Sequence, residues 1–193
     1  MHHVGARATL PVALVLVCSG VQAETDLSFY GGIAEAASPG STDGSVAASD
    51  TFGLRLLRWT DDALGYGIDF SRTSLEPAAT GTDSEPRRLD TLTATAAYRW
   101  PDSLGGVTPY VTGGLGVALP LVETAGSGDA TYRIGGPAAA LAGGIRYDVT
   151  DSASIFSEVR VTASRLSVDL EDGGTQSSDL LTNAVNLGVS FRF

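Results

Sequence analysis

The sequence predicts an all-β protein, an eight-stranded antiparallel up-and-down transmembrane β-barrel. Three observations favour this fold. Eight segments alternate apolar and polar residues with the period of two that gives a strand one apolar and one polar face. The connections between these segments alternate between short turns and long loops. The final residues, 185–193, alternate without interruption and end on the aromatic Phe193.

Turn-forming residues separate the eight segments. The segments are 27–36, 49–59, 64–75, 88–100, 108–119, 136–149, 153–170 and 182–193. Most are long enough to cross a bilayer, because a tilted strand needs only about 9–11 residues. The connections after the second, fourth and sixth segments are short (60–62, 101–107 and 150–152), and those after the odd segments are long (37–48, 76–87, 120–135 and 171–181). Transmembrane barrels have this asymmetry, with short periplasmic turns and longer external loops.

The N-terminus has the pattern of a secretory signal peptide. Arg7 precedes an apolar stretch over 8–18, and Val21-Gln22-Ala23 forms a cleavage site before Glu24. The apolar stretch is too short for a transmembrane helix, which needs about 20 residues. We therefore expect residues 1–23 to be a removed signal peptide and residues 24–193 to form the barrel domain. A retained N-terminal anchor is the alternative.

Composition excludes several functions. The formal net charge is -10, which argues against nucleic acid as a partner. The chain has no Lys, and residues 24–193 contain no Cys, His or Met. Disulfides, thiol nucleophiles and imidazole bases are therefore not available there. No long apolar run follows Ala23, so a membrane-spanning form must be a closed barrel, which satisfies every backbone polar group in lipid.

Aromatic residues gather near the short-turn ends of the segments, as an interfacial girdle would. The residues at this level are Phe29, Tyr30, Trp59, Tyr66, Tyr98, Trp100, Tyr110, Tyr147, Phe156, Phe191 and Phe193. Only Phe52, Phe70 and Tyr132 are candidates for the opposite rim.

The two faces of the segments differ in a way that indicates which one meets lipid. The apolar face is Phe29, Ile33, Phe52, Leu54, Leu56, Tyr66, Ile68, Phe70, Leu92, Ala94, Ala96, Tyr98, Trp100, Val111, Leu115, Val117, Leu119, Leu141, Ile145, Tyr147, Ile155, Val159, Val161, Val185, Leu187, Val189, Phe191 and Phe193. The other face holds mainly Gly, Ala and Thr with a few charges. Small residues suit the narrow lumen of an eight-stranded barrel, so we expect the apolar face to point outward.

Charged residues on the second face predict an ionic layer in the lumen. Arg55, Asp69, Arg146, Glu158 and Arg160 lie at comparable heights when counted from the short turns, with Asp148 on the same face and Asp90, Arg99 and Arg192 nearer the strand ends. A lipid-facing Arg at mid-height would cost roughly 2–4 kcal/mol. We expect Glu158 and Asp69 to neutralise Arg160, Arg146 and Arg55. This layer predicts either a plug of salt bridges or a gated pore, and the narrow lumen favours the plug.

The seventh segment changes its apolar phase. Val159 and Val161 share one parity, whereas Leu166, Val168 and Leu170 share the other. A bulge near Ser164, or a strand that continues beyond the bilayer into a loop hairpin, would explain the change.

Three stretches, 109–116, 143–151 and 186–193, resemble the OmpA/OmpX-like family of small outer-membrane β-barrels, including the opacity-like porin-family barrel domains. The resemblance implies the outer membrane of a Gram-negative bacterium, with its lipids and lipopolysaccharide as surroundings. It also implies that Val189, Phe191 and Phe193 form the C-terminal signal read by the outer-membrane assembly machinery.

Some small outer-membrane barrels are lipid A deacylases or palmitoyl transferases, but such sites need a His beside a Ser and an acid. The only histidines here, His2 and His3, fall in the predicted signal peptide. We therefore predict a non-enzymatic monomer without a cofactor. We also predict no metal site, since the acidic stretch 171–174 with Asp179 lacks EF-hand spacing. Its role is structural or surface-interacting; a surface adhesin or ligand binder acting through the long loops, and a small passive pore, are the alternatives.

Overall fold

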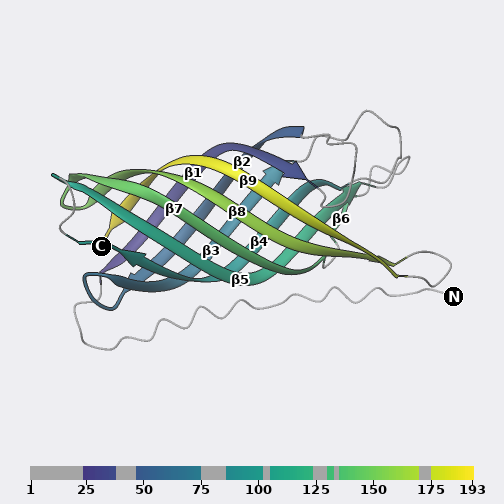
Figure 1. Cartoon of the computed structure of the whole chain (residues 1–193), viewed down its shortest axis with the longest axis horizontal. Helices are drawn as coiled ribbons and strands as arrows, with labels where there is room; N and C mark the ends of the chain where they lie inside the picture. The colour runs from purple at the N-terminus through teal and green to yellow at the C-terminus, as the bar shows by residue number, and fades with distance from the viewer. Residues whose placement is uncertain are drawn as a thin grey trace, which may run out of the picture.

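Alternating sequence becomes a closed antiparallel barrel in the computed structural model, which describes residues 24–37, 47–74, 86–101, 105–123, 130–132, 135–169 and 175–193 (Figure 1). The strands are β1 (Thr25–Ala37), β2 (Ala47–Trp59), β3 (Leu64–Ser74), β4 (Pro86–Arg99), β5 (Val107–Glu123), β6 (Ala130–Tyr132), β7 (Gly136–Thr150), β8 (Ala153–Asp169) and β9 (Thr175–Arg192). Among these described residues, no helix is long and apolar enough to span a membrane. The predicted signal peptide, residues 1–23, lies outside the described residues.

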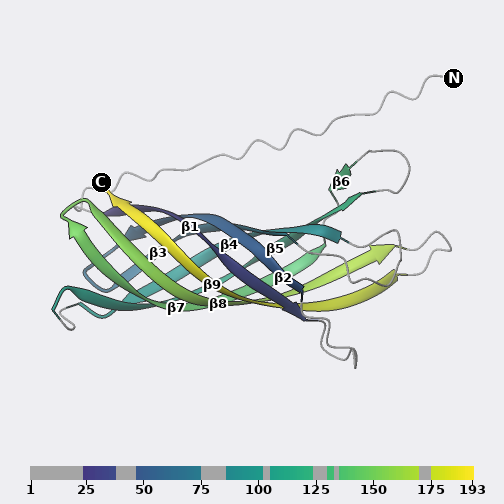
Figure 2. The same ribbon diagram turned by 90° about the horizontal axis from the view of Figure 1, so that it is seen from above.

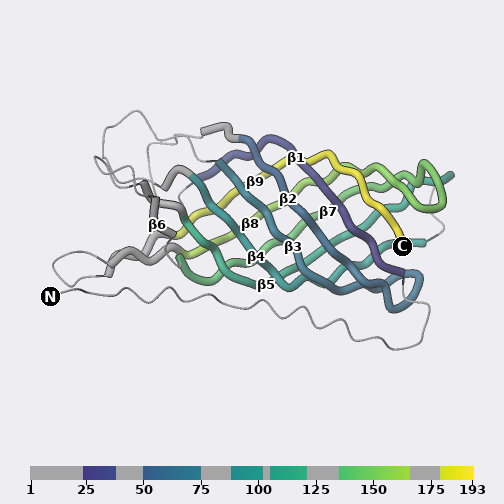
Figure 3. Tube along the Cα trace, turned by 180° about the vertical axis from the view of Figure 1, so that it is seen from behind, coloured from purple at the N-terminus to yellow at the C-terminus, as the bar shows by residue number. Residues whose placement is uncertain are grey.

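Eight strands close the barrel. The order around it is β4-β3-β2-β1-β9-β8-β7-β5, and pairing of β4 with β5 completes the ring. The seam between the two ends of the chain is the β1–β9 pair, in which Leu27 lies opposite Phe191 (Figure 3). The eight predicted segments correspond to these eight strands, so the predicted fold class is confirmed.

The structure extends two strands beyond the predicted ends. β5 continues to Glu123 and pairs there with the short β6, which the sequence did not predict (Figure 2). The β8–β9 ladder is continuous from Ala153 opposite Phe191 to Asp169 opposite Thr175, without a register shift near Ser164. The phase change in the seventh segment therefore marks a hairpin that continues past the barrel, and the bulge alternative is wrong.

A short turn joins β2 to β3 and is closed by a side chain. The Asp61 carboxylate accepts hydrogen bonds from the backbone N–H groups of Ala63 (2.8 Å) and Leu64 (2.6 Å). The N–H groups of Leu64 and Ala63 lower the pKa of this carboxyl below its ordinary value, because they stabilise its charged form. Asp at this position therefore specifies an Asx-type turn, as its side chain favours.

The outer surface of the barrel is apolar, as predicted. On β9, Leu187 is 69% exposed, and Phe193 directly after the strand is 74% exposed, whereas the alternate residues Asn186 and Ser190 are buried. The same alternation leaves large apolar side chains exposed on the other barrel strands. A continuous apolar surface of this kind around a closed barrel is a lipid-facing surface.

The predicted aromatic girdle is partly wrong. Tyr30, Trp59 and Phe156 are buried in the lumen, and the Tyr110 hydroxyl also bonds a lumenal carboxylate. Height along a strand does not decide the face, and these four residues have the parity of the polar set. The outward aromatics at this level are Phe29, Tyr66, Tyr98, Trp100, Tyr147, Phe191 and Phe193.

Candidate functional site

The middle of the lumen holds a central cluster of four charged residues, Arg55, Asp69, Glu158 and Arg160. Arg55 on β2 donates its Nε to Asp69 Oδ2 on β3 (2.6 Å), and its Nη2 lies 2.9 Å from both oxygens of Glu158 on β8. Arg160, two residues further along β8, donates Nη1 and Nη2 to the two oxygens of Asp69, both at 2.8 Å. Two cations and two anions therefore form one buried, neutral network.

The central cluster crosses the barrel. β3 and β8 stand on opposite sides of the ring, four strands apart in either direction. The two-pronged Arg160–Asp69 contact thus spans the lumen, and such bidentate pairs are the strongest and most directional of protein ion pairs. Many inward-facing residues on the other strands are small, which leaves room for these long side chains.

Polar and aromatic neighbours complete the network. The hydroxyls of Tyr30 and Tyr110 donate to Asp69 and Glu158 respectively, both at 2.8 Å. Asn186, directly opposite Glu158 on β9, donates its amide at 3.3 Å. The Arg160 guanidinium lies 4.7 Å from the centre of the Tyr30 ring. Buried ions are tolerable only with such compensation, since breaking one buried pair typically costs about 3–5 kcal/mol.

Arg146 does not belong to the central cluster, so the expected neutralisation by Asp69 and Glu158 is wrong for this residue. Its guanidinium pairs with Asp26, and its Nε donates to Asp148 Oδ1 at 3.0 Å. Arg146 lies opposite Phe156, whereas Glu158 lies opposite Gly144, one step further from the short turn. Arg146 and Glu158 flank the same short turn, so Arg146 lies one inward-facing step nearer the short-turn end of the lumen than the central cluster.

A second group of charges, which we call the short-turn cluster, fills the lumen at the short-turn end. Its members are Glu24, Asp26, Arg99, Arg146, Asp148 and Arg192. Arg99 on β4 reaches the Glu24 carboxylate at 3.2 Å and stacks 4.1 Å from the Trp59 ring. Arg192 on β9 pairs with Glu24 as well. Three arginines meet three carboxylates, so this cluster is also neutral.

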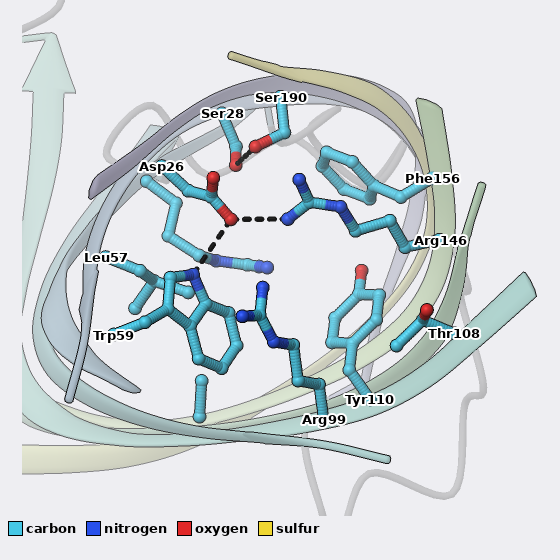
Figure 4. Close-up of a pocket in the computed structure, with 12 residues that line it drawn as sticks. Asp26, Ser28, Leu57, Trp59, Arg99, Thr108, Tyr110, Arg146, Phe156 and Ser190 are labelled. Atoms are coloured by element: carbon cyan, nitrogen blue, oxygen red, sulfur yellow. Dashed lines mark hydrogen bonds and ion pairs between the residues drawn. The ribbon is translucent and has the colours of Figure 1, made fainter. Parts of the chain in front are cut away.

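A chamber of about 30 Å³ separates the two clusters (Figure 4). Figure 4 shows Asp26 at its edge, bonded to Arg146 and to the indole N–H of Trp59, the latter at 2.8 Å. Leu57, Phe156 and Tyr110 provide much of the remaining wall. The volume suits one or two water molecules, which polar walls would hold. The lumen is thus occupied by two ionic layers with little free space between them.

Asp90 does not face the lumen, which corrects its placement on the second face. It pairs directly with Arg72 across β3 and β4, and Arg72 lies opposite Phe52, which is 50% exposed. Directly opposite residues share a face of a sheet. Asp90 has the parity of the outward Leu92, and parity along β4 could have placed it correctly.

Sequence reasoning missed Glu24, Asp26, Tyr30, Trp59 and Tyr110 as lumenal partners. Alternation was the available signal, because Asp26 and Tyr30 share the parity of the buried Ser28.

The residues of the proposed C-terminal signal, Val189, Phe191 and Phe193, all point outward beside the β1–β9 seam. Within the described ranges, no group of three or more His, Cys, Asp or Glu residues could hold a metal. The acidic stretch 171–174 lies outside those ranges, and Asp179 pairs with Arg165 at 2.8 Å.

A closed eight-stranded barrel with a lipid-facing exterior and a polar lumen defines an outer-membrane β-barrel protein. The family model described as the outer membrane protein beta-barrel domain matches residues 9–193, so this chain belongs to that family. The protein therefore resides in the outer membrane of a Gram-negative bacterium, surrounded by its lipids and lipopolysaccharide.

Solved structures share the fold. Neisserial surface protein A aligns with a TM-score of 0.69 and 17% identity, covering 88% of this chain and 97% of that one. Ail, the attachment invasion locus protein of Yersinia pestis, solved with the heparin analogue sucrose octasulfate, aligns with a TM-score of 0.55 and 16% identity over 90% and 100% of the chains. OprG from Pseudomonas aeruginosa aligns with a TM-score of 0.51 and 15% identity over 87% and 95%. A comparison with curated protein sequences found no match.

Proposed function

We propose that this chain is a non-enzymatic, monomeric barrel with a structural or surface-interaction role, whose lumen is plugged by ionic side chains. The observation that carries this proposal is the bidentate Arg160–Asp69 contact between opposite strands of the barrel. A hydrated ion that crosses the lumen would have to separate this pair. The short-turn cluster would then present a second obstacle.

The same geometry supports a non-enzymatic role. Asp69 and Glu158 each bond two arginines and a tyrosine hydroxyl. A carboxylate so bound is stabilised as an anion, and a general acid or base needs a proton that is easily exchanged. These carboxylates serve charge pairing in this proposal.

Ion conductance in planar bilayers tests the plug. We expect the parent barrel to show no large, stable channels. The double variant Asp69→Ala/Arg160→Ala should show increased conductance, because it removes the contact that spans the lumen. It removes a cation and an anion together, so the central cluster stays neutral. The matched control is Arg165→Ala/Asp179→Ala, which removes an equally neutral pair that is exposed outside the lumen. Heat-modifiable migration on gels checks that each barrel is folded. Large stable channels in the parent protein would contradict the plug and favour the small-pore alternative.

A surface adhesin or ligand binder is the second candidate, and the β8–β9 hairpin favours it. Beyond Ser164, where pairing with β7 ends, β8 and β9 continue as a pair from Arg165–Asp179 to Asp169–Thr175 (Figure 1). Ail, one of the similar structures, is an attachment protein that was solved with a heparin analogue. The acidity of the present chain opposes a polyanionic ligand of that kind, so the hairpin supports surface contact without naming the ligand.

The outer-membrane assembly machinery is a further proposed partner. An outward apolar row lies at the end of β9 and consists of Val189, Phe191 and Phe193. β9 is the strand that must pair with β1 to close the barrel. A row that ends beside the seam is suited to recognition before the barrel closes.

A further inference from the structure

The lipid-facing surface of the barrel carries a hollow over β7, β8 and β9. Its volume is about 520 Å³. The outward side chains that line it on these three strands are Ile145, Tyr147, Ile155, Ser157, Leu187 and Val189. Small-molecule sites have volumes of about 300–1,000 Å³ and are mostly apolar with a few polar groups. This hollow has both properties, and we call it the Ser157 groove.

A short side chain creates the Ser157 groove. Ser157 lies directly opposite Ile145 on one side and Leu187 on the other. These two neighbours are 53% and 69% exposed, whereas Ser157 is half-buried between them. Ser157 points outward, because Phe156 and Glu158 on either side of it are buried in the lumen. The groove is therefore the space that a larger side chain at position 157 would fill.

Ser157 also places a hydroxyl group within the apolar band. Its outward neighbours along β8, Ile155 and Val159, are both apolar and exposed. A hydroxyl that moves from water into hydrocarbon loses free energy unless it makes a hydrogen bond. A ligand that is mainly hydrocarbon but carries an acceptor would provide that hydrogen bond at the floor of the groove.

The aromatic girdle fixes the depth of the groove in the bilayer. Tyr147 lines the groove and lies directly opposite Ile155, which is one outward step nearer the short turn than Ser157. Outward tyrosines near this end of a barrel lie at the level of lipid headgroups. Ser157 is therefore one outward step above the headgroups, where the ester carbonyls of a phospholipid join its acyl chains.

Short turns face the periplasm, so the groove lies in the inner leaflet of the outer membrane, which consists of phospholipids. We propose that the Ser157 groove binds one inner-leaflet phospholipid. An acyl chain lies between Ile145 and Leu187, and an ester carbonyl accepts a hydrogen bond from the Ser157 hydroxyl. The groove is continuous with the lipid-facing surface, so the lipid enters laterally from the bilayer.

Native mass spectrometry of the folded barrel in detergent, titrated with phosphatidylethanolamine, tests the groove. We expect the parent barrel to bind one lipid saturably. Ser157→Leu should weaken this binding by about tenfold or more, because exclusion of only two methylenes from an apolar site has an effect of this size. Ala96→Leu is the matched control, because Ala96 is exposed on the outward face of β4 and does not line the groove. It should bind the lipid as the parent does.

An ether-linked analogue with the same headgroup and chain length tests the hydrogen bond, since it lacks the ester carbonyls. The parent should bind this analogue about fivefold more weakly than the ester lipid, as the loss of one hydrogen bond predicts. Ser157→Ala keeps the groove and removes the hydroxyl, so it should bind both lipids equally. The double comparison isolates the contact between the hydroxyl and the carbonyl.

Several results would overturn the site. Parent-like binding by Ser157→Leu would show that the lipid does not occupy the groove, and an equal loss in Ala96→Leu would assign the effect to the lipid-facing surface in general. Equal binding of the ester and ether lipids by the parent, or continued discrimination by Ser157→Ala, would remove the hydroxyl from the interaction. Heat-modifiable migration verifies folding; if Ser157→Leu does not fold, the ester and ether comparison with Ser157→Ala decides. None of these results depends on whether the lumen conducts.

Discussion

Glycine at two positions allows the central cluster to form. Tyr30 lies between Gly53 on β2 and Gly188 on β9, and Phe156 lies opposite Gly188 on its other side. A Cβ at Gly53 would come within 2.2 Å of the Tyr30 ring, and one at Gly188 within 2.3 Å of the Phe156 ring. The missing side chains thus leave space for rings that lie against the barrel wall. Tyr30 uses this position to bond Asp69.

Gly188→Ala should therefore destabilise the barrel. The new methyl would also lie 2.6 Å from the backbone oxygen of Phe29, which cannot move as a side chain can. Overpacking of this kind typically costs about 1–3 kcal/mol, and we expect a lower urea midpoint in detergent. Gly113→Ala is the matched control, because it is exposed on a barrel strand and a Cβ there meets nothing within 4 Å. Equal midpoints for the two variants would show that the rings do not depend on Gly188.

At the scale of the strand, alternation is sufficient to predict which residues face lipid, but it carries no information about the height of a residue along the barrel axis. Parity predicts that Arg55, Asp69, Glu158 and Arg160 face the lumen, and they meet there. Counting from the turns predicts the same layer for Arg146, but it lies one inward-facing step nearer the β7–β8 turn than Glu158 and pairs there with Asp26. The extended β8–β9 hairpin was one of two interpretations of a phase change, because a sequence alone does not show where a neighbouring strand stops pairing.

The β8–β9 hairpin also permits a test of orientation and of the second candidate function. We expect protease added to intact cells to cut between Asp169 and Thr175 but not at the β2–β3 turn around Asp61. A variant in which a two-residue turn replaces residues 166–178 should lose this cut and keep its unfolding midpoint, because the β8–β9 pairs within the barrel remain. If the hairpin is the adhesive element, adhesion of the cells to a surface should also fall in this variant. Cleavage at Asp61 from outside would reverse the proposed orientation.

Across the whole molecule, charge is separated into a neutral interior and an acidic remainder. The central cluster and the short-turn cluster together contain five arginines and five carboxylates, all of which face one another. The formal charge of -10 therefore resides outside these clusters. Neutral pairs lower the cost of burying ions in a narrow lumen, while surplus negative charge elsewhere favours solubility of the chain before it is inserted.

Closure of the barrel depends on the last strand, and Phe193 provides the test at this scale. Its backbone exchanges hydrogen bonds with Thr25, N–H to O in both directions at 3.0 Å, so deletion of the residue would remove both seam contacts and ring. Phe193→Ala keeps the backbone and removes only the ring. If the ring belongs to the signal read by the assembly machinery, the variant should accumulate several-fold less folded barrel in cells, yet refold from urea into detergent as the parent does.

Leu187→Ala is the matched control for Phe193→Ala, because Leu187 lies on the same strand and the same outward face and is nearly as exposed. The Leu187→Ala variant removes apolar contact with lipid at mid-height and leaves the end of the strand unchanged. We therefore expect it to accumulate in cells to the same amount as the parent barrel. Quantitative immunoblots of heat-modifiable barrel in outer-membrane fractions give one readout, and refolding yield of the purified chains gives the other. Parental accumulation of Phe193→Ala would remove the assembly role. Equal losses in both variants would assign the effect to lipid contact, and a matching loss in refolding would assign it to stability of the seam.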